Sequence, residues 1–360
     1  HDLGDAGLAA QAQDGAARPG VPVGRAQTGE GRHHDDLAGT VDQVNDIGQW
    51  GGLVILGRAP IGNCNTAVTA GTVNCEQEIE GVSGSPALYG GAIPTDRSGA
   101  LRYAQVRFVG SPLPGTTGNE LNGITFGGVG SDTTVDYVQV HNSADDGVEF
   151  FGGTVNVRHL VLTGNDDDSI DWDAGWIGNI QFAIVRQRDG AGDRMIEASN
   201  ATGSSLTAGQ LRSNPTLSNF TFIGTPQRGA TDLTAIILNS TTSGSLYNGV
   251  VTGSTVCLNT DTAATGADAP SFNSIMFDCS GAYGAAATAS IGAGANNSTA
   301  VANSLTNTFV NGPTENGRTA VNPTTLGPFF TAANYIGAVQ NSADRWWAGW
   351  SCGLEAATPR

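Results

Sequence analysis

The chain has 360 residues, a net charge of −17 and no lysine, so its permanently charged basic residues are all arginine. This acidic balance argues against a nucleic-acid partner, because phosphates select for basic surfaces, and no run of 18 apolar residues is present that could cross a membrane. Glycine is abundant, at 52 residues, and only 14% of residues are charged, which is typical of turn-rich all-β proteins.

Residues 1–46 differ from the rest of the chain. They contain no aromatic residue and show no alternation of apolar and polar side chains. We expect an N-terminal arm here, either disordered or atypical. The run His33-His34-Asp35-Asp36 has metal-binding residue types, but solvated polar chain is the favoured interpretation, because nothing around the run would fix a geometry.

A β pattern begins near residue 47 and extends to about residue 324. Its first unit is Gly48 to Gly57, in which Leu53 aligns with the aliphatic position of the later repeats. Four later blocks repeat at a period of about 22 to 26 residues, which indicates a repeat architecture. Their aliphatic column is Ile124, Val148, Ile170 and Ile196, and the column two residues further on is Phe126, Phe150, Trp172 and Ala198.

A second repeated strand alternates with the first. Its copies begin near Leu101, Val135, Val157 and Ile180, with weaker copies from Leu217 and Leu246. We expect the apolar pairs within these strands to point inward: Ala104/Val106, Val138/Val140, Leu160/Leu162, Ala183/Val185 and Phe220/Phe222. Each repeat would be one coil with two strand segments, and successive coils would stack in parallel. This predicts a right-handed parallel β-helix formed by a single chain (a single-stranded β-helix). The longer repeats carry inserted loops at residues 110–119, 187–214 and 226–235.

Four of the five cysteines predict two disulfides. Cys64 and Cys75 bracket one polar loop, and Cys257 and Cys279 bracket another, without the spacing or histidines of a zinc site. Disulfides imply an oxidising compartment, so we expect a secreted, periplasmic or outer cell-surface protein. Cys352 is left over, and we interpret it as a buried structural thiol.

The C-terminal part changes character twice. Residues 281–303 are rich in Ala, Gly, Asn, Ser and Thr, and would form either thin further coils or a loop. Residues 325–360 contain Trp346, Trp347 and Trp350. These rings could stack on sugars, but a solenoid needs its core end covered, so an aromatic C-terminal cap is the favoured prediction.

Acidic residues line up in the central repeats. Asp145, Asp167 and Asp193 form one column, Asp146 and Asp168 a second that ends in Arg194, and Glu149, Asp171 and Glu197 a third. Neighbours in a column would lie about 4.8 Å apart, where like charges repel by about 1 kcal/mol even in water. Ca²⁺, which binds several carboxylates in flexible geometry, would offset the repulsion, with Asp146, Asp168, Glu149 and Asp171 as candidate ligands. Raised pKa values are the alternative.

Turn chemistry also explains part of this pattern. Asp145, Asp166 and Asp167 occupy turns, where Asp side chains accept hydrogen bonds from nearby backbone amides. Glu149, Asp171 and Glu197 lie within strands, so that explanation fails for them. They are the favoured catalytic candidates, together with Arg194. For substrate binding the candidates are His141 and Arg186, which share an outward column, and Trp176, in a turn where we expect exposure.

Several blocks resemble a family of secreted bacterial β-helix proteins often labelled lipoprotein or cell-surface protein. The blocks are Gln49 to Gly57, Asn119 to Ile124, Asp145 to Gly153 and Tyr335 to Ala338, and the resemblance covers residues 47–355. More distantly, the architecture is similar to the pectate-lyase-like superfamily. Polygalacturonase-type members carry Gly-His-Gly and Arg-x-Lys motifs, which this chain lacks. Lyases of the superfamily use Ca²⁺ held by acidic side chains plus a basic residue, which Asp145, Asp146, Asp167, Asp168 and Arg194 could provide.

Three functions follow as hypotheses. The first is a secreted or cell-surface β-helix that binds a polysaccharide or another cell-surface ligand, with Ca²⁺ as a structural or bridging ion. The second is a polysaccharide lyase or glycoside hydrolase acting at the acidic face, which rests on fold analogy. The third is a structural adhesin or surface-layer component. An open groove over the strand-borne acids would favour an enzyme, and a flat solvated face would favour binding or structure.

Overall fold

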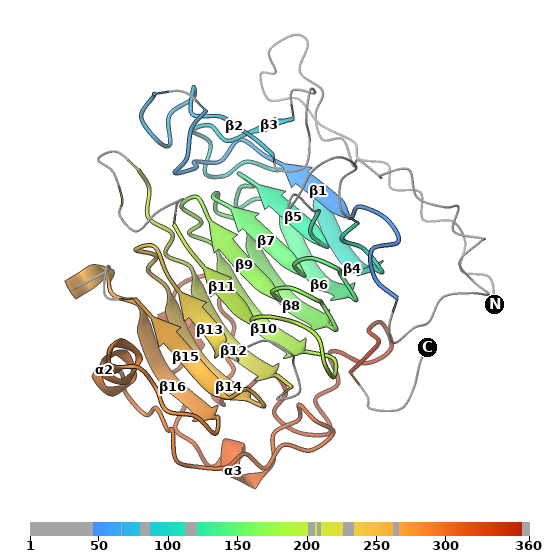
Figure 1. Ribbon diagram of the computed structural model, residues 1–360, viewed down its shortest axis with the longest axis vertical. Coiled ribbons are helices and arrows are strands. Elements are labelled where there is room, and N and C mark those ends of the chain that lie inside the picture. The colour runs from blue at the N-terminus through green and yellow to red at the C-terminus, as the bar shows by residue number, and fades with distance from the viewer. Residues whose placement is uncertain are drawn as a thin grey trace, which may run out of the picture.

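The protein is a stack of coils, shown in Figure 1. The computed structural model describes residues 46–65, 67–79, 87–111, 121–200, 206, 210–225, 234–261 and 266–354. Of the expected N-terminal arm, residues 1–45, with His33 to Asp36, lie outside the described residues, as do parts of the three inserted loops.

Each coil contributes one short and one long strand, and the two kinds form separate seven-stranded parallel sheets. The short sheet contains β1 (Leu53–Leu56), β5 (Ile124–Gly127), β7 (Val148–Phe151), β9 (Ile170–Asp173), β11 (Ile196–Ala198), β13 (Thr234–Leu238) and β15 (Val256–Thr260). The long sheet contains β4 (Ala100–Arg107), β6 (Thr134–His141), β8 (Asn156–Thr163), β10 (Asn179–Arg186), β12 (Thr216–Ile223), β14 (Ser245–Thr252) and β16 (Ser271–Asp278). This is the predicted right-handed parallel β-helix.

The register of the strands confirms the predicted columns. Leu53 pairs with Ile124, and the aliphatic column continues through Val148, Ile170 and Ile196. The predicted inward pairs of the long strands pack in one continuous core between the sheets, with Ala104 partly buried at its edge. Because side chains alternate along each strand, the residues between these core positions face outward, and they decide what each flank of the solenoid can bind.

Each long strand bends at its fourth residue. There the backbone adopts a left-handed conformation, with φ between 52° and 64°, at Tyr103, Tyr137, His159, Phe182, Asn219, Asn248 and Ser274. This conformation is unfavourable for residues other than glycine. The bend adds one residue between successive inward positions, as the inward pairs Leu101/Val135 and Ala104/Val138 show. The third and fourth residues of each long strand therefore both face outward.

The first four bend residues stack their rings along the outer flank. Tyr103 lies on Tyr137 with centroids 4.5 Å apart, Tyr137 on His159 at 4.1 Å, and His159 on Phe182 at 5.0 Å, all within 15° of parallel. Aromatic pairs of this kind contribute about 0.5–1.5 kcal/mol each beyond area burial, which helps offset the backbone strain.

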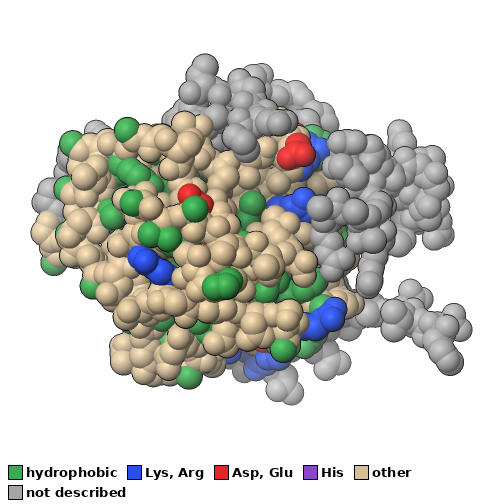
Figure 2. Space-filling model, turned by 90° about the horizontal axis from the view of Figure 1, so that it is seen from below, with side chains coloured by type: hydrophobic (Ala, Val, Ile, Leu, Met, Phe, Trp, Pro, Cys, Tyr) green, Lys and Arg blue, Asp and Glu red, His purple; other side chains and the backbone are tan. Residues whose placement is uncertain are grey.

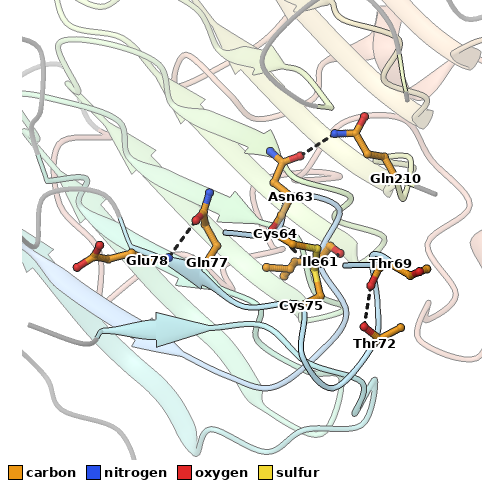
Figure 3. The surroundings of a disulfide bond; sticks show 9 residues. All are labelled: Ile61, Asn63, Cys64, Thr69, Thr72, Cys75, Gln77, Glu78 and Gln210. Atoms are coloured by element: carbon orange, nitrogen blue, oxygen red, sulfur yellow. Dashed lines mark hydrogen bonds between the residues drawn. A yellow bond between two sulfur atoms is a disulfide. The ribbon is translucent and has the colours of Figure 1, made fainter. Parts of the chain in front are cut away.

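Both predicted disulfides are present. Cys64–Cys75 closes the loop that projects beside β2 (Gln77–Glu78) and β3 (Leu88–Tyr89), which form a small antiparallel pair. Figure 3 shows this loop, with Asn63 accepting a hydrogen bond from Gln210. Cys257–Cys279 joins β15 to the residue that follows β16. The two bonds are consistent with an extracytoplasmic location, and Cys352 is free and partly exposed.

A helix covers the last complete coil. Helix α2 (Ala285–Ala293) follows the short 3₁₀ turn η1 (Gly266–Asp268) and β16, and its Ala287 and Ile291 are buried in the main core. The expectation of thin coils or a loop in the low-complexity region was therefore wrong in this part. Its many alanines favour a helix, which closes the core at the end of the solenoid. Among the described residues, no helix is long and apolar enough to cross a membrane.

The C-terminal segment covers a flank and not an end. We call residues 305–354 the C-terminal strap; it includes α3 (Pro313–Asn316) and η2 (Pro323–Thr325). Its Phe309, Val339 and Trp347 form an apolar cluster with outward residues Val161 and Ile184 of the long sheet. The aromatic residues predicted to cap the solenoid thus lie along this flank, where the outward apolar column offers the strap a surface to bury, while α2 covers the end of the main core.

Side-chain amides of the long sheet bind the backbone of the strap. Gln139, Gln181 and Asn248 each pair with both the N–H and the C=O of one strap residue, respectively Cys352, Thr331 and Val321, at 2.7–2.9 Å. Asn219 donates to the carbonyls of Ala333 and Tyr335. These amides satisfy backbone groups that no sheet partner satisfies. Viewed from below, the side on which α3 lies in Figure 1, the surface carries few charged side chains (Figure 2).

Candidate metal centre

The acidic face lies on the outer side of the short sheet. Thr125, Glu149, Asp171 and Glu197 pair in register on β5, β7, β9 and β11. The predicted strand-borne column therefore exists. Glu149 is buried, at 8% exposure, and accepts a hydrogen bond from Asn122 Nδ2, while Asp171 and Glu197 are partly buried. Asn122 was not among the predicted residues. The sequence did offer a signal for it, because Asn122 stands one coil before Asp146 at the same position of the repeat.

The second acidic column forms a ladder between coils. Asp146 Oδ1 accepts the backbone N–H of Asp168 at 3.0 Å, and Asp168 Oδ1 accepts that of Arg194 at 2.5 Å. The two carboxylates are only 6% and 3% exposed. Each one thus uses one oxygen to hold the next coil. The stack explains how carboxylates come to be buried here, because the hydrogen bonds compensate part of the cost of desolvation.

Three groups of carboxylates have ligand atoms close enough to hold a cation. Within each group the oxygens all lie within 4.8 Å of one another. The groups are Asp145–Asp146–Asp167, Asp146–Glu149–Asp171 and Asp167–Asp168–Asp193. The first and third groups are the same arrangement displaced by one coil. Asp145 and Asp167, interpreted from sequence as turn residues, thus also lie in these groups.

Burial and mutual repulsion raise the pKa of the central acids. Desolvation is the largest cause for Asp146, Asp168 and Asp171, whose pKa values all lie well above 3.8. The Glu149 carboxylate is the next cause for Asp171, and Asp171 is the next for Asp146. Such a cluster binds either protons or a cation more readily than isolated carboxylates do.

Arginines lie at the border of the acidic face. Arg194 ends the Asp146–Asp168 column and pairs with Asp193 at 2.5 Å, and Arg188 pairs with Asp166. Arg194 is thus an ion-paired side chain beside the third carboxylate group. Its predicted catalytic role stays a prediction, because the pairing supports a structural role equally well.

The structure buries His141 and binds the partly exposed Arg186 to the strap. Their shared outward column is present, through Thr163. However, His141 is only 6% exposed and its Nδ1 contacts Thr163 Oγ1 at 2.7 Å, while Arg186 Nη1 donates to the carbonyls of Gly353 and Leu354. The sequence placed them outward, but the strap covers this part of the flank.

Trp176 was expected to be exposed, and this was wrong. Its side chain is fully buried and stacks on Phe150 with ring centroids 4.0 Å apart, and its Nε1 donates to the Val155 carbonyl. The turn that carries it folds back into the core, so the ring completes the aromatic spine of the solenoid. It is unavailable for sugar stacking.

Comparison with known proteins supports the fold and leaves the ligand open. No curated protein matches the chain, and no solved structure matches it. The profile of the family described as a pectate-lyase-like β-helix domain matches residues 31–351, most of the chain, including the acidic face and nearly all of the strap. The protein therefore belongs to the pectate-lyase-like β-helix family.

Proposed function

We propose that this protein is a secreted, periplasmic or outer-surface carbohydrate-binding β-helix whose acidic face holds Ca²⁺. The observation that carries this proposal is the Asp146–Glu149–Asp171 group, in which two coils contribute carboxylate oxygens within 4.8 Å of one another. Ca²⁺ takes oxygen ligands at about 2.3–2.6 Å, so two ligands of one ion lie at most about 5 Å apart. The spacing of the carboxylates fits a single ion.

Electrostatics support a cation over an empty cluster. After desolvation, the charges of Glu149 and Asp168 are the two largest causes of the raised pKa of Asp171. A divalent cation bound among these carboxylates would relieve several of the repulsions at once. Magnesium fits less well, since it demands strict octahedral geometry and retains its waters. A Ca²⁺ ion with free coordination positions can also bridge to carboxylate or hydroxyl groups of a sugar, which links the ion to the proposed carbohydrate ligand.

Calorimetric titration of chelator-treated protein with Ca²⁺ tests this function. The wild type should bind Ca²⁺, and the double variant Glu149→Gln/Asp171→Asn should lose most of that affinity. A matched control is Asp132→Asn/Glu78→Gln, which removes two exposed carboxylates away from the acidic face. Absence of Ca²⁺ binding by the wild type, or equal loss in both double variants, would contradict the proposal.

Catalysis at the acidic face is the second candidate. The raised pKa of Asp171 favours it, because a carboxyl group that keeps its proton to a higher pH is better suited to act as a general acid. A polysaccharide panel with and without Ca²⁺ separates the two functions. Cleavage products that disappear in Asp171→Asn would establish an enzyme, and binding without any product would support the carbohydrate-binding protein.

A further inference from the structure

The aromatic stack on the long sheet has one open end. Tyr103 is the first ring of the stack and is 63% exposed, although one face of its ring lies against Tyr137. The strand that carries it, β4, is the edge strand of the long sheet. The opposite face of the Tyr103 ring therefore points away from the stack, toward the position that a ring of a preceding coil would occupy.

Among the described residues, the strap contacts this ring at its edge, and the only ring stacked on it is that of Tyr137. Trp350 approaches Tyr103 edge-on, with centroids 6.4 Å apart and planes at 90°, and approaches Tyr137 in the same way at 5.8 Å. Trp346 contacts the later rings, His159 and Phe182. His159 and Phe182 are thus contacted by Trp346, whereas Tyr103 is contacted by Trp350 at one edge of its ring.

A cationic side chain stands beside the open ring. Arg102 precedes Tyr103, faces outward because of the bend, and is exposed. It forms no ion pair with any residue that the structure describes, and Asp136, its neighbour in register, contacts His159 Nδ1 through Oδ1 at 2.8 Å. Its exposed guanidinium is therefore able to donate to an anionic ligand.

We propose that Tyr103, Arg102 and Trp350 form a second carbohydrate subsite, which binds a uronic acid residue. The apolar face of a pyranose ring would take the next position in the stack on Tyr103, against the edge of Trp350. The Arg102 guanidinium would pair with the sugar carboxylate, a geometry that guanidinium groups favour. Neutral sugars would gain the stacking contact alone.

This subsite is separate from the acidic face. It lies on the long sheet at the first coil, whereas the carboxylate groups belong to the turns before the short strands and to β7 and β9. Both sites would bind an anionic sugar through a positive charge. The Tyr103 subsite would use the guanidinium of Arg102, and the acidic face would use a bound cation. Removing divalent cations therefore isolates the Tyr103 subsite, so its failure and that of the Ca²⁺ site can be told apart.

The test is titration of the full-length protein, in chelator, with a galacturonate hexamer, a guluronate hexamer, cellohexaose and a Trp-containing peptide. We expect at least one uronate to bind more tightly than cellohexaose and the peptide. Tyr103→Ala should weaken uronate binding by about two- to tenfold, and Tyr103→Phe should retain it. Arg102→Gln should weaken uronate binding by about fivefold and leave cellohexaose binding unchanged. Tyr247→Ala, an outward tyrosine on β14 of the same sheet, is the matched control.

Thermal melting shows whether each variant is folded, and Ca²⁺ titration of Tyr103→Ala should match the wild type. The proposal is overturned if no uronate binds the wild type in chelator. It is also overturned if folded Tyr103→Ala binds as tightly as the wild type, if Tyr247→Ala weakens binding equally, or if the peptide is the preferred ligand.

Discussion

The two flanks of this solenoid use the same outward positions for opposite purposes. On the long sheet, outward residues such as Gln139, Gln181 and Val161 are fully buried because the C-terminal strap lies on them. On the short sheet, the outward residues of the central coils include the carboxylates Glu149, Asp171 and Glu197, and the first and third raise the pKa of Asp171. A parallel β-helix leaves both flanks free to vary, so one flank can stabilise the fold while the other carries a site.

The largest expected effect is on the covered flank. Trp347 is 9% exposed and meets Phe309 at 4.9 Å in the cluster that joins the strap to the sheet. Trp347→Ala should lower the free energy of unfolding by about 3–5 kcal/mol, through lost burial and a new cavity. Urea denaturation measures this, with Ile93→Ala, at an exposed position, as the control. A loss below about 1 kcal/mol would mean that the strap is not part of the cooperative fold.

A smaller effect should follow from removing one amide that binds the strap. Gln139 accepts the N–H of Cys352 at 2.9 Å and donates to its carbonyl at 2.7 Å. Gln139→Ala leaves these groups without that partner and should cost about 1–3 kcal/mol. Gln77→Ala is the control, since that side chain only accepts from the next backbone amide. Equal effects in the two variants would show that the paired amides do not hold the strap.

The solenoid was predictable because its evidence is local and repeated. A side chain that recurs every coil marks a column, and the columns of Ile124 and Glu149 are in register as predicted. The strap was not predictable in this way, since its contacts join residues such as Gln139 and Cys352, 213 positions apart. A glutamine inside an apolar strand was the one signal that something must bind there.

The bend and the buried turn were missed for a different reason. Tyr103 and Phe182 adopt a left-handed backbone that propensities disfavour, and stacking against the rings of neighbouring coils helps offset its cost. Trp176 was assigned to solvent because it lies in a turn, but its burial depends on the space beside Phe150. In each case tertiary packing overrode the local preference, so these features emerge only when the coils are stacked.

On the acidic flank we expect a substitution to raise the free energy of unfolding and not to lower it. In chelator near pH 7, Asp171→Asn removes repulsion with Glu149 and Asp168 and should raise the free energy of unfolding by about 1 kcal/mol. Ca²⁺ should stabilise the wild type and not the variant. Asp132→Asn, at an exposed turn position, is the control and should do neither. Destabilisation by Asp171→Asn in chelator would show that this carboxylate is stabilised by partners within the chain.

The smallest effect is the pH dependence of that difference. The folded-state pKa of Asp171 lies above 3.8, so the folded protein binds this proton more tightly than the unfolded chain does. Its contribution to stability is therefore fully present below pH 3.8 and is lost as the pH rises through the raised value. In chelator, the advantage of Asp171→Asn over the wild type should shrink as the pH falls from 7 toward 4. Unfolding measured across this range checks the trend. An advantage that stays constant with pH would mean that Asp171 is ionised throughout this range, which would contradict a folded-state pKa raised by burial and by the neighbouring carboxylates.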